Sequence, residues 1–419
     1  MLKLPRSFEQ YRGLRKEIYV LFFGRIVTSL GSMIWPVLTL ILSQKMGMNA
    51  QRIAAVMVAS SLIMIPANLA GGRIADRFNK KRVIVVCDAL SIACFLISAA
   101  VPLSYVTVAL FLAAGICQSM EYPSYNALIA DLTRTDDRER AYSLEYLGMN
   151  LGMVLSPTIA GLLFQRFLWL SFLISGVAIG LSTLLIVFRI KDITPVEDTG
   201  EKGEYQKARD DAGLLTVLKE NPLVPVFIVC MSVYYAAYGQ YNFLMPLDMG
   251  RVHGEQGAVI YGTVSSLNCI IVVLCTPFIT RLFRKLSDPK KLLTGECLVA
   301  VGYALFLVLL GHIPVYYAAI ILFTWGEIFT TISEGPYLST RIPASHRGRI
   351  NGLSSVLGTL ITGAGDLASG HIYDSAGGAA AWTLVLSMLA LAGVLTAVLI
   401  ARDKKAYPKL YLTDNSDIT

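Results

Sequence analysis

Two acidic residues stand inside apolar stretches of this sequence, each two residues before a proline. Glu121 lies in "SMEYPSY" and Glu334 lies in "SEGPYL". An acid within an apolar segment is costly, usually faces protein or water, and often marks an ion or proton pathway. The repeated Glu-x-Pro pattern therefore predicts two carboxylates that bind protons or substrate. The alternative is that each acid only forms a hydrogen bond in helix packing.

Two further charged residues extend this set. Arg25 lies about seven residues into the first apolar stretch, and Glu327 precedes Glu334 by about two helical turns. An ion pair between Arg25 and either Glu121 or Glu334 would favour the ionised form of that acid and make it a poor proton carrier. The other acid would then carry the proton. The sequence leaves open which acid has which role.

Aromatic residues predict a substrate wall near the middle of the chain. The stretch "YYAAYGQYNF" spaces three tyrosines as on one helical face, with polar side chains beside them. Aromatic faces with polar tips suit amphipathic or cationic ligands, although tyrosines also anchor helices at membrane interfaces. The candidate wall residues are Tyr234, Tyr238, Tyr241, Gln240, Asn242 and, in the first apolar stretch, Trp35.

The composition indicates that a membrane surrounds these residues. Hydrophobic residues make up 55% of the 419, charged residues 16%, and the mean hydropathy is +0.59, whereas soluble domains are about 25% charged. Apolar runs of ~20 residues, long enough to span a bilayer, recur along the chain. We predict an all-α polytopic membrane protein with twelve spans, at about 19–44, 53–75, 83–103, 105–131, 141–165, 168–189, 224–247, 257–280, 292–311, 314–340, 350–373 and 380–401.

A polar connection after the sixth span predicts two six-helix halves. Shifting the sequence by 209 residues places Arg138 and Arg140 over Arg347 and Arg349. These arginines begin an R-x-R-x-x-x-L pattern that both halves share. Such repeats are typical of transporters whose halves are related by an axis along the membrane normal. The predicted parts are the N-terminal half 1–189, a linker 190–222, the C-terminal half 223–402 and a tail 403–419.

The positive charges predict the topology. Lys and Arg gather in the first 16 residues, in every second loop, and after the last span; Arg341 is counted with the loop that follows the tenth span. Because cytoplasmic loops retain positive charge, both termini are expected in the cytoplasm, in a plasma-membrane protein. The same asymmetry explains the net charge of +7, so no nucleic-acid partner is expected.

Several classes of protein are not expected. There is no phosphate-binding loop, nucleophile motif or metal-ligand cluster, so neither an enzyme nor an ATP-driven pump is indicated, and no cofactor or metal site is predicted. The seven cysteines lie in or beside apolar spans without metal-ligand spacing, which favours a packing role.

One loop carries a family resemblance. The segment "GGRIADRFNKKR" (71–82) resembles the major facilitator superfamily loop G-x-x-x-D-R-x-G-R-K, with Asn79 at the second glycine, where Asn tolerates the left-handed conformation. The resemblance implies a cytoplasmic brace that sets the conformational balance, with its acid near the start of the eleventh helix. The matching residues are Gly72, Asp76, Arg77, Lys80 and Lys81.

The fifth span resembles that family's antiporter pattern, G-x-x-x-G-P-x-x-G-G. Gly152, Pro157 and Gly161 match it, whereas Ser156 and Ala160 replace two glycines. In the family this pattern accompanies drug:proton exchange, but helix packing alone also selects small residues. The family's usual arginine on the fourth helix is missing, because Phe111 stands about where it is expected.

Two functions remain. The favoured one is proton-coupled efflux of amphipathic or cationic small molecules by alternating access, with protons as the coupling ion and the protein acting as a monomer in the lipid bilayer. The alternative is an importer or facilitator of small polar or anionic solutes, in which Arg25 binds the anion.

Overall fold

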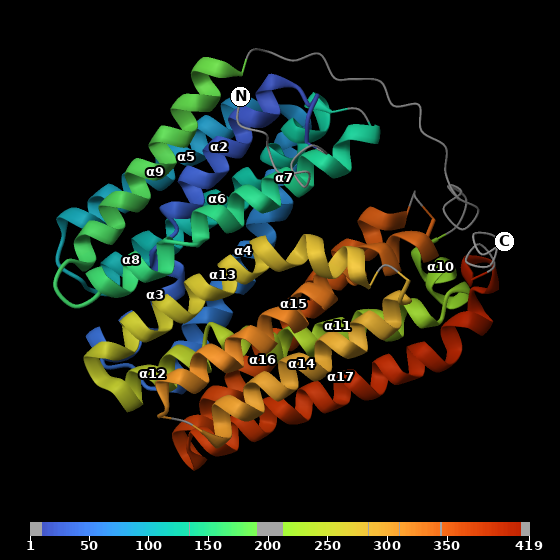
Figure 1. Cartoon of the computed structure of the whole chain (residues 1–419). Coiled ribbons are helices and arrows are strands. Elements are labelled where there is room, and N and C mark those ends of the chain that lie inside the picture. Colours follow the sequence, from blue (N-terminus) through green and yellow to red (C-terminus); the bar gives the residue numbers. More distant parts are fainter. Residues whose placement is uncertain are drawn as a thin grey trace. The chain divides into compact units, whose positions relative to one another are not determined.

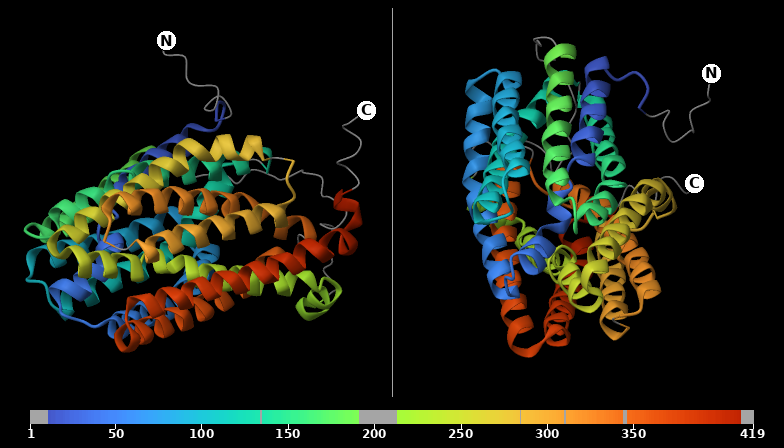
Figure 2. Two further views of the ribbon diagram at one scale, coloured as in Figure 1. Left: turned by 60° about the horizontal axis from the view of Figure 1, so that its bottom comes forward. Right: turned by 90° about the vertical axis from the view of Figure 1, so that its left-hand side faces the viewer.

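The computed structural model describes residues 11–133, 135–190, 213–283, 285–309, 311–343 and 346–411. Within these ranges the regular structure is helical, and no strand occurs (Figure 1). Two further views show the same helices and their short connections (Figure 2). Most of the predicted linker and the end of the predicted tail lie outside the described residues.

The first six predicted spans each overlap a helical segment. The fifth is interrupted, and Pro157 lies in the first turn of the helix that follows, where its missing N–H costs nothing. The helices are α2 (Lys16–Leu30), α3 (Ile34–Leu40), η1 (Ile41–Lys45), α4 (Ala50–Arg77), α5 (Lys80–Ala100), α6 (Tyr105–Leu132), α7 (Thr135–Met153), α8 (Ser156–Leu163) and α9 (Leu168–Arg189).

The last six predicted spans also overlap helices. They are preceded by a short helix, α10 (Leu214–Glu220), and the helix of the last span continues beyond residue 403. The remaining helices are α11 (Leu223–Tyr238), η3 (Gly239–Tyr241), α12 (Leu244–His253), η4 (Gly254–Gln256), α13 (Gly257–Leu282), α14 (Asp288–Val308), α15 (Ile313–Arg341), α16 (Arg347–Ala376), α17 (Gly378–Ala406) and η6 (Pro408–Tyr411).

The lengths and hydropathy of these helices fit a multi-pass membrane protein. In the described part of the chain, ten helical segments are long and apolar enough to cross a membrane, and one of them, Leu223–Leu282, contains two of the predicted spans. Helix α16 is long enough but is not among the ten. The all-α membrane fold predicted from the sequence is therefore confirmed.

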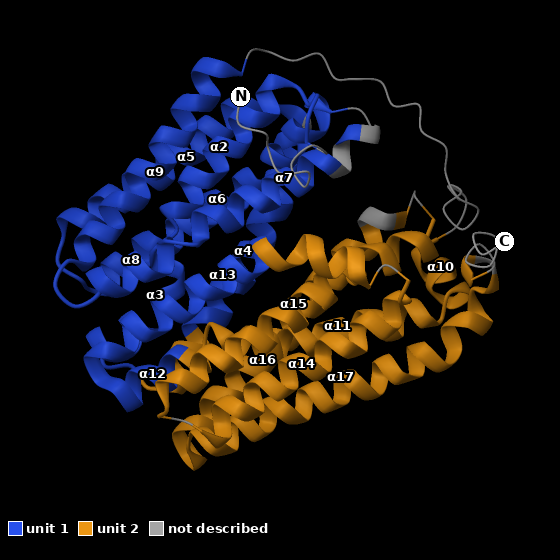
Figure 3. Ribbon diagram, viewed as in Figure 1, with its two compact units in different colours: residues 1–48, 56–200, 246–273 blue, residues 49–55, 201–245, 274–419 orange. Residues whose placement is uncertain are grey.

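The chain forms two compact units (Figure 3). Unit 1 comprises residues 1–48, 56–200 and 246–273, and unit 2 comprises residues 49–55, 201–245 and 274–419. The boundaries differ from a simple cut at the linker, because segments 49–55 and 246–273 belong to the unit formed mainly by the other half.

Helix packing repeats between the two units. In unit 1, α2 packs against α7 and α9, and α5 packs against α6 and α9. In unit 2, α11 packs against α16 and α17, and α14 packs against α15 and α17. In each half, the helix of the first span packs against those of the fifth and sixth, and the helix of the third span packs against those of the fourth and sixth. This repeated packing agrees with the repeat detected in the sequence.

An apolar cluster fixes the part of α2 that leads to Arg25. Ile18 and Leu21 of α2 are fully buried against Leu128 of α6 and Leu144 of α7. Arg25 follows Leu21 by about one helical turn, so the same packing directs its side chain toward α6 and α7.

Candidate functional site

Unit 1 contains an ion pair between α2 and α7. The Nε of Arg25 donates to Oε2 of Glu145 at 3.3 Å, and the two side chains are 25% and 7% exposed. Only this one contact joins them, although a guanidinium and a carboxylate can form two parallel bonds. The pair is therefore partly buried and incompletely bonded.

Tyr125 of α6 completes this cluster. The guanidinium of Arg25 lies 4.5 Å from the centre of the Tyr125 ring, a distance typical of a cation–π contact. The Tyr125 hydroxyl lies 3.1 Å from Oε2 of Glu145 and 3.2 Å from the carbonyl of Leu21. Oε1 of Glu145 is buried and has no hydrogen-bond partner within the described residues. Glu145 thus keeps unused bonding capacity.

The predicted partner of Arg25 was wrong. From the sequence, Glu121 and Glu334 were the candidate partners, whereas the structure pairs Arg25 with Glu145. Glu121 forms no ion pair in the described part of the chain. The sequence does contain Glu145 within the fifth predicted span, three residues before Gly148. Its position in the sequence does not tell which helix its side chain faces.

In unit 2 the acids of α15 meet tyrosines of α11. The hydroxyl of Tyr235 donates to Oε2 of Glu334, and the hydroxyl of Tyr238 interacts with the carboxylate of Glu327. Tyr235 was not among the predicted wall residues. Tyr235 is 37% exposed, whereas Tyr234 is 1% exposed. The accessible face of α11 is therefore the one that carries Tyr235, and not the predicted face that carries Tyr234.

The predicted aromatic wall is largely interior. Tyr238 and Tyr241 stack on Phe323 of α15, each with a centroid distance of 5.1 Å, and Tyr241 is 8% exposed. Gln240 is fully buried and donates to Oδ1 of Asp366 at 2.7 Å. Tyr234, Tyr241 and Gln240, which were predicted to line a substrate wall, are thus packed in the interior of unit 2. Asn242 is exposed.

Trp35 borders a small hollow within unit 1. It is 39% exposed, and its ring centre lies 4.6 Å from that of Phe111. Phe111 is buried, so an aromatic ring occupies the region where the family arginine was expected. The polar lining residues of the hollow are Thr28, Ser32, Gln118 and Ser175.

Two lysines of the loop motif bind helix ends in unit 1. Lys80 pairs with Asp131 at the end of α6. Lys81 donates to the carbonyls of Val187 and Ile190, at 2.8 and 2.6 Å, where a cation satisfies the free carbonyls at the end of α9. Both lysines therefore tie helices of one unit together. Arg77 is exposed.

The other motif residues behave differently from expectation. Asn79 is not left-handed: its φ is −60°, and its side chain caps α5 by accepting from the N–H of Arg82, a favoured role of Asn. The tightly packed glycine is Gly71, where a Cβ would lie 2.2 Å from the Met120 carbonyl, whereas the space beside Gly72 is open. The side chain of Asp76 lies outside what the structure describes.

Small residues of the fifth span lie at close helix contacts. A Cβ on Gly152 would lie 2.4 Å from the Ile26 carbonyl, and one on Gly161 would lie 2.4 Å from the Ala258 carbonyl. Glycine is needed at both positions because the facing backbones leave no room for a side chain. Packing thus explains these glycines without reference to the direction of transport.

The repeated helix packing and the apolar spans are typical of a membrane transporter of duplicated helical architecture. The sequence pattern of the Major Facilitator Superfamily matches residues 21–365. The chain belongs to this family. It is a multi-pass membrane transporter that acts on small-molecule substrates, and not an enzyme.

The relatives have varied roles. An uncharacterised MFS-type transporter of Bacillus subtilis, YqjV, is 27% identical, with 73% of each chain covered. A Na⁺, Li⁺, K⁺/H⁺ antiporter of Planococcus maritimus is 23% identical, covering 78% of this chain and 82% of its own. The multidrug resistance protein MdtH of Yersinia pestis is 24% identical, covering 87% and 88%.

Solved structures share the fold. A POT family transporter in complex with a thioalcohol-conjugated peptide matches with a TM-score of 0.76 at 12% identity, covering 93% of this chain and 96% of that one. The human organic anion transporter MFSD10 (TETRAN) matches with a TM-score of 0.63 at 16% identity, covering 90% and 98%. At such identities the likeness concerns the fold alone, because one fold serves many substrates.

Proposed function

We propose that this transporter exports amphipathic or cationic small molecules in exchange for protons, by alternating access. The observation that carries the proposal is the pairing of Arg25 with Glu145. Because this pair neutralises Arg25, Glu121 and Glu334 have no cationic partner within the described residues. Unpaired acids favour cations and protons as their ligands.

The same observation weighs against the alternative function. An importer of anionic solutes would need Arg25 to bind a carboxylate or phosphate, but its guanidinium already contacts Glu145 and Tyr125. An anion would have to displace a buried carboxylate, which is costly. Two of the relatives, a cation/proton antiporter and a multidrug resistance protein, agree with the favoured function.

The test is transport by the purified protein in proteoliposomes, with ethidium as a cationic probe and calcein as an anionic one. We expect a pH gradient to drive accumulation of ethidium and not of calcein. In Glu334→Gln, gradient-driven accumulation should be lost, whereas exchange of ethidium without a gradient should persist. This split follows if Glu334 is the proton carrier, since the amide cannot ionise.

Two controls sharpen this test. Glu255→Gln changes an exposed acid of η4 and should leave both activities unchanged. Glu327→Gln should alter affinity for the cation more than coupling. Accumulation that survives Glu334→Gln would remove Glu334 from the proton pathway, and calcein accumulation that depends on Arg25 would favour the anion importer instead.

The proposal includes a setting for the protein. We place both termini in the cytoplasm on the basis of the Lys and Arg distribution in the sequence, and we further propose a monomer in the plasma membrane. Protease or labelling access to tags at each end, in intact cells and in inverted vesicles, measures this topology directly.

A further inference from the structure

A buried acid outside the site described above lies in α14 of unit 2. Glu296 is 2% exposed. Its Oε1 accepts from the hydroxyl of Thr396 at 2.7 Å and from the thiol of Cys230 at 3.4 Å. Its Oε2 is buried without a hydrogen-bond partner in the described ranges. A carboxyl group is thus held among a hydroxyl, a thiol and apolar helix surfaces.

Unit 1 contains the same arrangement at the equivalent place. Asp88 of α5 is 7% exposed, and its Oδ2 lies 2.6 Å from the hydroxyl of Thr183 in α9. Glu296 follows Asp88 by 208 residues (296 − 88), one less than the repeat offset. The pairing of α5 with α9 corresponds to that of α14 with α17, which carries Thr396. The acid–threonine pair is therefore part of the duplicated architecture.

The surroundings of Glu296 favour a neutral carboxyl. In the part of the chain that the structure describes, no Lys, Arg or His forms an ion pair with it. The titratable groups near it are Cys230 and Tyr234 of α11 and the adjoining Cys297, none of which supplies a positive charge. An isolated buried carboxylate is so costly that the group takes up a proton instead.

The hydrogen-bond geometry at Asp88 also favours a neutral carboxyl group. The hydroxyl of Thr183 has two oxygens within reach, the carbonyl of Ile179 at 2.8 Å and Oδ2 of Asp88 at 2.6 Å, but it has only one hydrogen to donate. A protonated Asp88 supplies the second hydrogen, by donating to the threonine oxygen while the threonine donates to Ile179.

We propose that Glu296 is a proton-binding site of unit 2, distinct from Glu334, and that its proton exchanges with solvent while the transporter is folded. The site lies between α14, which carries Glu296, α17, which carries Thr396, and α11, which carries Cys230. The inference does not depend on the substrate or on the direction of transport.

The test is infrared spectroscopy of the purified full chain without substrate, in H₂O and D₂O. A protonated carboxyl has a C=O band separate from that of a carboxylate, and replacement of its hydrogen by deuterium shifts the band. In the wild type we expect such a band with a component that shifts in D₂O. Glu296→Gln should remove that component, Thr396→Val should shift its frequency without removing it, and Glu255→Gln should leave it unchanged.

Each outcome decides the proposal. A protonated-carboxyl band that is unchanged by both Glu296→Gln and Thr396→Val would overturn it, and so would a Glu296 component that does not shift in D₂O. If Glu296→Gln does not fold, the shift produced by Thr396→Val decides alone. If a pH gradient does not drive dye transport, the proposed function is overturned, but the protonated-carboxyl band of Glu296 is unaffected. The two proposals can therefore be tested independently.

Discussion

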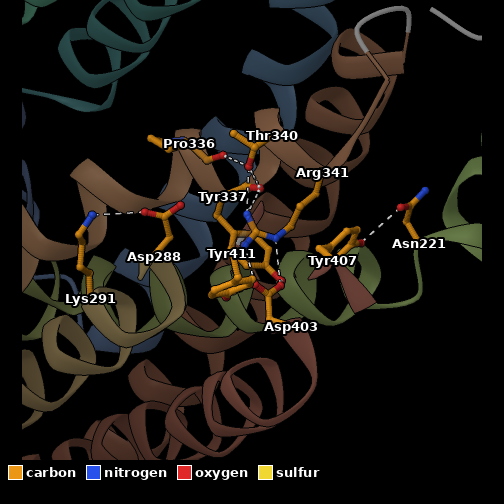
Figure 4. Close-up of polar contacts among 10 residues, drawn as sticks. All are labelled: Asn221, Asp288, Lys291, Pro336, Tyr337, Thr340, Arg341, Asp403, Tyr407 and Tyr411. Atoms are coloured by element: carbon orange, nitrogen blue, oxygen red, sulfur yellow. Dashed lines mark hydrogen bonds and ion pairs between the residues drawn. The ribbon is translucent and has the colours of Figure 1, made fainter. Parts of the chain in front are cut away.

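Each unit has an arginine–carboxylate pair, and the two pairs differ in both bonding and burial. In unit 1, Arg25 makes one 3.3 Å contact with Glu145 and is 25% exposed. In unit 2, Arg341 meets Asp403 through two bonds, Nε to Oδ1 at 2.9 Å and a terminal nitrogen to Oδ2 at 2.5 Å, and the side chains are 4% and 1% exposed (Figure 4).

The neighbours increase the difference. Asp403 also accepts from Tyr337 at 3.0 Å and from Tyr411 at 2.6 Å, and Arg341 donates to the Tyr337 carbonyl at 2.9 Å (Figure 4). In contrast, one oxygen of Glu145 has no partner in the described residues. Separating a buried ion pair whose hydrogen bonds are nearly all made would lose bonds without forming new ones. A pair with unused bonding capacity loses less when its side chains move.

The comparison assigns different roles to two arginines that look alike in the sequence. Arg341 was counted in the sequence with the loop that follows the tenth span; the structure shows it as the last residue of α15, buried and paired with Asp403 of α17. Its bonds hold α15 and α17 together. Arg25 has the less complete bonding of the two and is the more exposed.

The largest expected effect is on the unit 2 pair. Asp403→Asn should lower the free energy of unfolding by about 3–5 kcal/mol, because it leaves Arg341 buried without its counter-charge. Denaturation of the purified protein in detergent measures this loss. The double variant Arg341→Leu with Asp403→Leu should recover much of it, since no lone charge remains. Equal stability of Asp403→Asn and wild type would show that the pair is not structural.

An intermediate effect is expected for the unit 1 pair. Glu145→Gln should lower the free energy of unfolding by about 1–3 kcal/mol, less than Asp403→Asn, because Arg25 keeps partial access to solvent and its contact with Tyr125. Gradient-driven transport should fall as well. The matched control is Glu121→Gln, which breaks no ion pair and should change stability little. A larger loss for Glu121→Gln than for Glu145→Gln would contradict the observed pairing.

The smallest expected effect concerns Tyr411, in the turn after α17. Tyr411→Phe should cost about 1 kcal/mol, the value of one hydrogen bond. Burial, together with the hydrogen bond to Asp403, raises the pKa of the Tyr411 hydroxyl above its ordinary value. The contribution is therefore fully present below the unfolded pKa of about 10 and is lost only as the pH rises through the higher folded value.

The pH dependence gives this prediction its control. The difference in stability between wild type and Tyr411→Phe should be constant from about pH 6 to pH 9, since both states keep the phenol protonated there. A difference that shrinks within this range would mean that the hydroxyl is not held by Asp403.

The sequence by itself determined the class of the protein. Twelve apolar runs, a polar linker and a repeated motif predicted an all-α membrane fold in two similar halves, and the helices and the family match confirm the fold. These features are readable because the bilayer sets both the length and the hydropathy of each span. The acids Glu121 and Glu334 were likewise visible, since a charge within an apolar run is rare.

Only the tertiary structure decided which residues meet. The pairing of Arg25 with Glu145, the bonding of Arg341 to Asp403, and the exposure of Tyr235 in place of Tyr234 could not be read from the sequence. In a soluble helix the apolar stripe identifies the buried face, but α11 has apolar residues all round, as expected of a membrane span. Packing between helices therefore selects the partners, and residues far apart in the sequence meet, such as Arg25 and Glu145, which are 120 positions apart.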